Sequence, residues 1–236
     1  MRTSRPGERP EIVALRIGLR SARANVVPMV ALWALAAVTL WAYYAVPSVA
    51  AALEPLLRWQ TESGWLAAFL NRVFFNGLLP GVFLLVIPSI RPKHVLLVIA
   101  AQALWGGGWG VVTDFFFRGL DALFGSGRDF ATLFCKMMLD EFGLTLFLVA
   151  PADAAFFFWA GRDFSFARTW RERPKRYFLG LVLPNLISNW CVWVLVSLAI
   201  FAFPLPLQVQ LSGFAAAFWT LMCLQIGVRT KNTEIL

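Results

Sequence analysis

Asn185, Ser188 and Asn189 are polar residues at the beginning of an apolar run, residues 184–206, that is long enough to cross a bilayer. They lie at i, i+3 and i+4, so they share one face of a helix. Asp153 lies near the middle of another apolar run, LFLVAPADAAFFFWAG. A carboxylate at bilayer depth costs about 2.5 to 3.5 kcal/mol unless pairing, water or protonation relieves it. We expect this polar patch to face Asp153, either as hydrogen-bond glue between helices or as part of an aqueous pathway.

A glycine-rich run, GGGWG at residues 106–110, interrupts a third apolar segment. Gly106 and Gly110 are four residues apart and therefore share one helix face. The same spacing relates Ala103 to Gly107. Small residues on one face let a neighbouring backbone approach closely, so the run predicts a helix-packing surface rather than a phosphate-binding loop.

Charged residues continue this face at the same spacing. Asp114 follows Gly110 by four residues, Arg118 follows by four more, and Asp121 comes three later. An ion pair that locks the outer end of the helix is one interpretation, and a charged vestibule to a pathway is the other. Lys136 and Asp140 are expected to complete an interfacial charge cluster with Arg118 and Asp121.

The residues that usually carry catalysis or bind metals are sparse. His94 is the only histidine and follows Lys93 at the edge of an apolar run, where an interfacial role is expected. Cys135, Cys191 and Cys223 are an odd number and predict no disulfide framework. No metal-ligand cluster, phosphate loop or nucleophile motif is present, so we expect no metal, no cofactor and no enzymatic activity.

The amino-acid composition indicates that these residues lie in a membrane protein. Hydrophobic residues make up 59% of the 236 residues and charged residues only 14%, with 22 Phe and 11 Trp. One soluble core of this length does not need so many apolar residues. In lipid only helices or closed barrels satisfy the backbone, and the apolar runs are too long for barrel strands. The predicted fold is all-α, a polytopic transmembrane helical bundle.

Six apolar runs reach the length of about 20 residues that a spanning helix needs. Two further segments, residues 51–70 and 128–142, mix apolar and charged residues and are predicted to be amphipathic helices at the interface. The six apolar runs are the expected spans, and they are residues 26–50, 71–90, 94–117, 143–160, 177–203 and 207–227.

This organisation divides the chain into four parts. Residues 1–25 form a basic N-terminal tail, and residues 26–93 contain the N-terminal spans with an interfacial helix. Residues 94–227 form a second transmembrane part, and residues 228–236 a C-terminal tail.

The distribution of basic residues predicts the orientation of these spans. With both termini inside, sixteen of the 21 Lys and Arg residues fall in inside segments, as the positive-inside rule requires. The net charge of +8 is then explained by topology and by contact with anionic lipid headgroups, and nucleic acid is not expected as a partner. The sequence is also compatible with a homo-oligomer.

Several motifs resemble, in order and spacing, those of the Mpv-seventeen/peroxisomal membrane protein twenty-two family. GGGWGVVTDFF and KMMLDEFG are similar to its glycine-rich and Lys-x-x-x-Asp-Gln elements, with Glu141 in place of the family's Gln. The C-terminal signature is matched at Asn189, Trp193, Phe201, Pro204 or Pro206, and Trp219. Val194, Ser197 and Ile200 replace the family's Pro, Gln and Asn. The likeness covers about half the chain, residues 100–227, and indicates a distant member.

The resemblance implies a small polytopic protein associated with a weakly selective channel for small solutes or metabolites, in a mitochondrial inner or peroxisomal membrane. A non-conducting scaffold or homeostasis protein, including a quality-control protein, fits the packing features equally well. The 17 Arg against 4 Lys also suit a bacterium with a GC-rich genome, which favours a bacterial cytoplasmic membrane.

Overall fold

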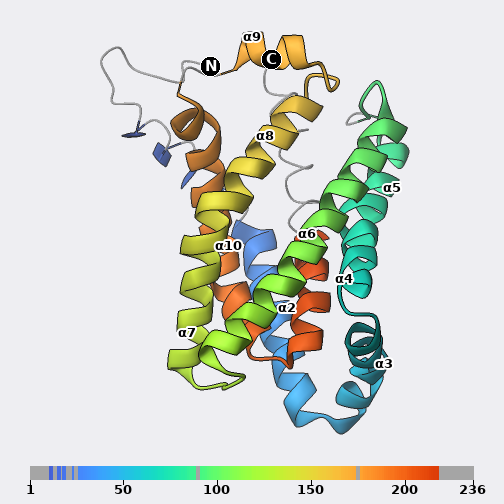
Figure 1. Cartoon of the computed structure of the whole chain (residues 1–236), viewed down its shortest axis with the longest axis vertical. Helices are drawn as coiled ribbons and strands as arrows, with labels where there is room; N and C mark the ends of the chain where they lie inside the picture. The colour runs from blue at the N-terminus through green and yellow to red at the C-terminus, as the bar shows by residue number, and fades with distance from the viewer. Residues whose placement is uncertain are drawn as a thin grey trace. The chain divides into compact units, whose positions relative to one another are not determined.

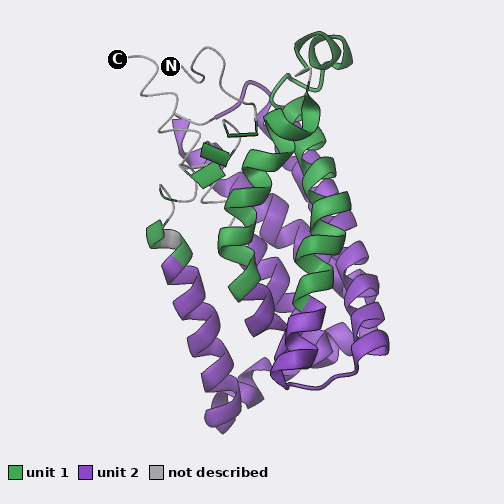
Figure 2. Cartoon of the chain, turned by 90° about the vertical axis from the view of Figure 1, so that its left-hand side faces the viewer, with its two compact units in different colours: residues 1–29, 137–195 green, residues 30–136, 196–236 purple. Residues whose placement is uncertain are grey.

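Helices are the only regular secondary structure in the part of the chain that the computed structural model describes, in agreement with the predicted all-α class (Figure 1). The described residues are 26–88, 91–173 and 176–217, together with seven positions between 11 and 23. They form two compact units, each assembled from separate parts of the chain (Figure 2). Unit 1 comprises Met1–Met29 and Met137–Leu195, and unit 2 comprises Val30–Lys136 and Val196–Leu236.

Four helices among the described residues are long and apolar enough to cross a membrane. They are compatible with an integral membrane protein. A fifth is added if two helices joined at a sharp bend form one span, so the predicted six are not confirmed. Residues 205–217 are helical, whereas residues 218–227 of the last predicted span lie outside the described part. The four helices are Trp65–Val86, Val95–Phe124, Phe130–Ala160 and Phe178–Phe201.

The sharp bend divides the first predicted span, residues 26–50. Helix α2 (Val26–Ala45) ends there, and α3 (Pro47–Ser63) leaves at an angle of 103°. Val46 between them is extended, with φ −121° and ψ 102°. A residue before proline avoids the helical conformation, and Pro47 itself has no N–H to donate to the preceding turn.

A glycine makes the next break. Gly64 has φ +53°, a left-handed conformation that glycine adopts at little cost, and it separates α3 from α4 (Trp65–Arg72). Helix α4 continues directly through η1 (Val73–Leu78) into α5 (Leu79–Val86). The predicted interfacial helix over 51–70 is therefore split, and the second span begins at Trp65 instead of residue 71.

The second predicted interfacial helix, residues 128–142, is instead the beginning of a long helix. Helices α7 (Phe130–Leu139), η3 (Asp140–Val149) and α8 (Ala150–Ala160) follow one another without a break. Lys136 is one of the charged residues of this segment, but its side chain is only 1% exposed and pairs with Asp121. An internal ion pair thus accounts for one of the charges that indicate an interfacial location.

Three π-helical segments share one relation to proline, because each ends two residues before one. Proline lacks the N–H for the regular bond to residue i−4, and its ring crowds that carbonyl group. A wider turn with i→i+5 bonds accommodates the defect without breaking the helix. The pairs are η1 with Pro80, η3 with Pro151, and η4 (Phe178–Val182) with Pro184 at the beginning of α10 (Leu183–Phe201).

The glycine face of α6 (Val95–Phe124) packs against α4 and η1 in unit 2. A Cβ atom on Gly110 would collide with the carbonyl oxygen of Ala68. A Cβ atom on Gly106 would lie 2.7 Å from Cβ of Asn76, and one on Gly107 would lie 2.5 Å from the Phe69 ring. Backbone and side chains of the neighbouring helix therefore occupy the space that larger residues would need.

We expect Gly110→Ala to destabilise the protein by about 1 to 3 kcal/mol, because the new methyl group meets backbone that is not free to rotate away. Gly108→Ala is the matched control, since no atom lies within 4 Å of the Cβ position at Gly108. Thermal unfolding in detergent micelles measures both variants. Equal melting temperatures would contradict this account of the packing.

Asp129 caps the beginning of α7. Its carboxylate accepts hydrogen bonds from the backbone N–H of Thr132 at 3.0 Å and from the Thr132 hydroxyl at 2.7 Å. These bonds, the backbone one foremost, lower the pKa of Asp129 below its ordinary value of 3.8. The cap therefore stabilises the folded state above the unfolded pKa, and this stabilisation is lost as the pH falls through the lower folded pKa.

Asp129→Ala should lower the melting temperature at pH 7, with the difference from wild type closing below about pH 4 as the wild-type carboxylate protonates. Asp129→Asn retains a good capping residue and is the control. Melting curves over a pH series check the result. A difference that persists unchanged at pH 2 would assign the effect to something other than the ionised cap.

Candidate functional site: a buried amide network

Asp114 is the predicted site residue that is connected, directly or through other side chains, to several buried polar groups of unit 2. It lies on α6 one turn beyond Gly110 and is 2% exposed. Gln60 of α3, also buried, donates from Nε2 to Asp114 Oδ1 at 2.9 Å and to the carbonyl oxygen of Gly64 at 2.9 Å. One amide thus connects α3, the break at Gly64 and α6.

The second partner of Asp114 is Arg118, one turn further along α6. Arg118 Nε lies 3.0 Å from Asp114 Oδ2, and Arg118 Nη2 lies 3.2 Å from Oδ1. The arginine side chain is 47% exposed, whereas the carboxylate is buried. The ion pair therefore extends from the surface of the unit, at Arg118, to its interior, at Asp114.

Two more amides extend the chain of hydrogen bonds away from Asp114. Gln210, in the helix over 205–217, donates from Nε2 to Gln60 Oε1 at 2.6 Å. Asn71 of α4 donates from Nδ2 to Gln210 Oε1 at 2.5 Å. All three side-chain amides donate in the direction of the carboxylate, as its negative charge favours. We call Gln60, Asn71, Asp114, Arg118 and Gln210 the amide network.

The far end of the amide network is closely packed. Asn71 Oδ1 is buried and has no hydrogen-bond partner among the described residues. It lies against the α-carbon of Gly213, where any Cβ atom would overlap it. Beside it, Arg72 Nη2 donates to Ser212 Oγ at 3.0 Å. A buried carbonyl oxygen without a donor is costly, so this end carries an unfavourable contribution to stability.

Sequence reasoning identified Asp114 and Arg118 but missed Gln60, Asn71 and Gln210. Asn71 lies at the edge of a predicted span, and Gln60 lies in a segment predicted to be an interfacial helix. The available signal was the occurrence of amides inside or beside apolar runs, which also includes Gln210. Such residues are costly in lipid unless they face a partner.

Unit 1 holds a second polar cluster, around Glu141 in η3. Glu141 is buried, and its Oε2 accepts from Asn189 Nδ2 at 3.4 Å, while its backbone oxygen accepts from Trp190 Nε1 at 3.0 Å. Ser188 Oγ donates to the carbonyl oxygens of Gly18 and Pro184 at 3.1 and 3.2 Å. Asn189, expected to face Asp153, is thus hydrogen-bonded to a different acid.

Asn185 and Asp153 are the other residues predicted for this site. Asn185 is exposed, and Asp153 is half-buried in the first turn of α8. The three polar residues on α10 therefore differ in exposure, and Ser188 and Asn189 have different hydrogen-bond partners.

Three of the four residues of the predicted interfacial charge cluster take part in ion pairs of unit 2. Arg118 pairs with Asp114, and Lys136 Nζ donates to Asp121 Oδ1, both within unit 2. Asp140 is half-buried and belongs to unit 1. The Lys136 ammonium is the more deeply buried member of its pair, so the Asp121 carboxylate is required to offset its desolvation.

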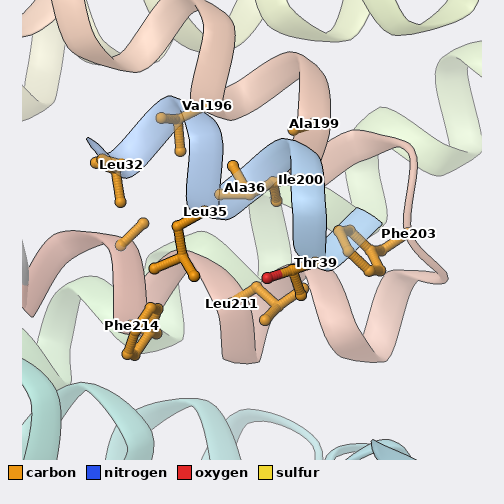
Figure 3. A pocket seen from close by; sticks show the side chains of 11 residues that line it. Leu32, Leu35, Ala36, Thr39, Val196, Ala199, Ile200, Phe203, Leu211 and Phe214 are labelled. Carbon is orange, nitrogen blue, oxygen red and sulfur yellow. The ribbon is translucent and has the colours of Figure 1, made fainter. Parts of the chain in front are cut away.

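A small apolar cavity of about 40 Å³ lies elsewhere in unit 2 (Figure 3). Thr39 supplies the hydroxyl oxygen among otherwise hydrocarbon side chains such as Leu32, Ile200 and Phe214. This volume is close to that of one water molecule, and the lining offers few polar groups to bind one. Among the described residues, no three His, Cys, Asp or Glu side chains form a group that could hold a metal ion. The amide network is therefore the candidate site.

Gln60→Leu should destabilise unit 2, because it removes one donor from Asp114 and the acceptor of Gln210. Each buried polar group left unpaired costs about 1 to 3 kcal/mol. Thr61→Val is the neighbouring control, since Thr61 is exposed and its hydroxyl bonds only to the Leu57 carbonyl oxygen of its own helix. Thermal unfolding in micelles compares the two, and a loss of similar size in both variants would show that the amide is not a central connection.

Comparison with known proteins adds no relative to this picture. No protein-family model matches the chain, and no curated protein or solved structure matches it significantly. The resemblance to the Mpv-seventeen/peroxisomal membrane protein twenty-two family therefore stays a prediction that depends on the motifs themselves. Two of its positions, Asn189 and Glu141, are joined in unit 1 by the hydrogen bond described above.

Proposed function

We propose that this chain is an integral membrane protein that conducts small solutes or metabolites with weak selectivity, along a pathway lined by the amide network. The observation that carries the proposal is the unbroken line of buried polar side chains from half-exposed Arg118 to Asn71. Ionisable and amide side chains are rare inside spanning helices and commonly mark solute pathways.

Two features of the line support this role. Asn71 lies within the helix Trp65–Val86 and Asp114 within the helix Val95–Phe124, both long enough to span a bilayer. At the far end, the unpartnered Asn71 Oδ1 offers an acceptor to a permeating donor group. Amides that exchange hydrogen bonds with one another can exchange them with a passing polar solute at little net cost.

The family resemblance supports this proposal, and we include distant membership of that family in it. As a distant member, the chain would be a small polytopic protein concerned with metabolite homeostasis. The arginine-rich composition favours a bacterial cytoplasmic membrane, and the positive-inside distribution predicts that both termini lie inside. The mitochondrial inner and peroxisomal membranes are the alternative locations.

A non-conducting scaffold is the second candidate, and one observation favours it. Every side-chain amide nitrogen of the amide network already has an acceptor, and Gly213 closes directly onto Asn71. Satisfied hydrogen bonds and close packing at glycine are also what holds membrane helices together. Solute flux separates the two functions.

Planar-bilayer recordings of the purified protein provide the test. We expect wild-type protein to conduct and Asp114→Asn to change the ratio of cation to anion permeability, because it removes the buried charge and retains the shape of the side chain. Glu54→Gln is the control, since it removes a half-exposed acid of α3 that pairs with neighbouring Arg58 in its own helix.

Asp153→Asn and Asn189→Leu examine unit 1 in the same recordings over a range of pH. If these variants alter selectivity and Asp114→Asn does not, the pathway lies in unit 1 and the proposed lining is wrong. Silence of correctly folded wild-type protein at all voltages and pH values would contradict conduction and support the scaffold.

A further inference from the structure

The connection between the last two described spanning helices contains a short helix of its own. Helix α9 (Phe166–Glu172) lies in unit 1 between the end of α8 at Ala160 and the beginning of η4 at Phe178. Figure 1 shows α9 lying across the end of α8, and Figure 2, turned by 90°, shows it nearly end-on. Because a spanning helix ends on each side of it, α9 lies at a membrane surface, along the interface.

Large aromatic side chains are exposed on α9. Phe166 and Trp170 are 76% and 68% exposed, and their spacing of four residues places them on the same face. Phe166 also packs against Trp159 of α8, with ring centroids 4.9 Å apart, which fixes its position at the end of the spanning helix. Exposed aromatic rings at this location are typical of side chains that enter the headgroup region of a bilayer.

Arginines surround these rings, and only some of them are neutralised. Arg162 pairs with Glu172 at 3.1 Å, and Arg168 pairs with Asp163 at 2.9 Å. These pairs engage both acidic residues that the structure describes in the connection.

Three further arginines leave the connection with an excess of positive charge. Arg171 is 78% exposed and lies 3.6 Å from the already paired Glu172. Arg173 and Arg176 are exposed and form no ion pair with a described residue. The guanidinium group of Arg173 stacks on Trp170, 3.4 Å from the ring centroid, so a cation is held directly beside an exposed aromatic ring.

We propose that α9, together with Arg173 and Arg176 after it, binds anionic phospholipid headgroups of the surrounding bilayer. Phe166 and Trp170 enter the interface, and Arg171, Arg173 and Arg176 contact the phosphates. The occupant is a lipid surface because the neighbouring spanning helices hold the connection against the bilayer, and because its surplus charge is opposite to that of anionic leaflets. The site would anchor unit 1 on the side that the charge distribution predicts to be inside.

The test measures lipid binding to the full-length protein in detergent, by native mass spectrometry and by the shift in melting temperature. Phosphatidylglycerol is compared with phosphatidylcholine of the same acyl chains. We expect phosphatidylglycerol to bind more tightly and to raise the melting temperature more. Arg171→Gln combined with Arg173→Gln should weaken its affinity about fivefold for each arginine removed, with little change for phosphatidylcholine.

Arg58→Gln combined with Arg91→Gln is the charge-matched control, since both arginines are exposed in unit 2. Lysine at 171 and 173 should restore most of the affinity, because it restores the charge. Trp170→Ala should weaken the binding of both lipids, because it removes apolar contact, and should weaken phosphatidylglycerol more, because it also removes the ring that holds the Arg173 guanidinium group.

Four outcomes would overturn the proposal. They are equal binding of the two lipids by wild-type protein, an equal loss of phosphatidylglycerol affinity in the control variant, full competition by inorganic phosphate, and binding of an acidic peptide in place of the lipid. The last two would identify a soluble anion or an acidic protein as the ligand.

Discussion

The close approach of α4 and η1 to α6 is the constraint on which unit 2 depends. Lipid tails are as apolar as leucine side chains, so spanning helices gain little from burying hydrophobic surface against one another. Contact must come from packing and from polar partners. The glycine face provides the packing, because Gly110 leaves room for the backbone at Ala68. One turn later the same face brings Asp114 to Gln60, at a hydrogen-bond distance of 2.9 Å.

Polar residues then determine which segments meet within each unit. A buried carboxylate or amide requires partners, and those of Asp114 come from both near and far in the chain. In unit 1 the same requirement joins Glu141 of η3 to Asn189 of α10. The groups that make the chain a candidate channel are therefore also groups that hold its helices together. Conduction would require these bonds to be exchanged with solute rather than simply broken.

Three prolines modify their helices without ending them, whereas a fourth stands at a bend. Each of three prolines is preceded by a π-helical segment that keeps the span continuous, whereas Pro47 follows extended Val46 and turns the chain by 103°. The turn before each of the three prolines is widened into a π-helix, whereas Val46 before Pro47 is extended and not helical.

The amino-acid sequence by itself determined the properties that depend on local spacing and composition. These are the helical class, the apolar character of the spans, the glycine face of α6 and the neighbourhood of Asp114 and Arg118 four residues apart. Only the tertiary structure decided the partners that lie far apart in the chain: Gln60 with Asp114, separated by 54 residues, and Asn71 with Gln210, separated by 139. Helical periodicity relates residues three or four positions apart, and it carries no information on which distant face will satisfy a buried amide.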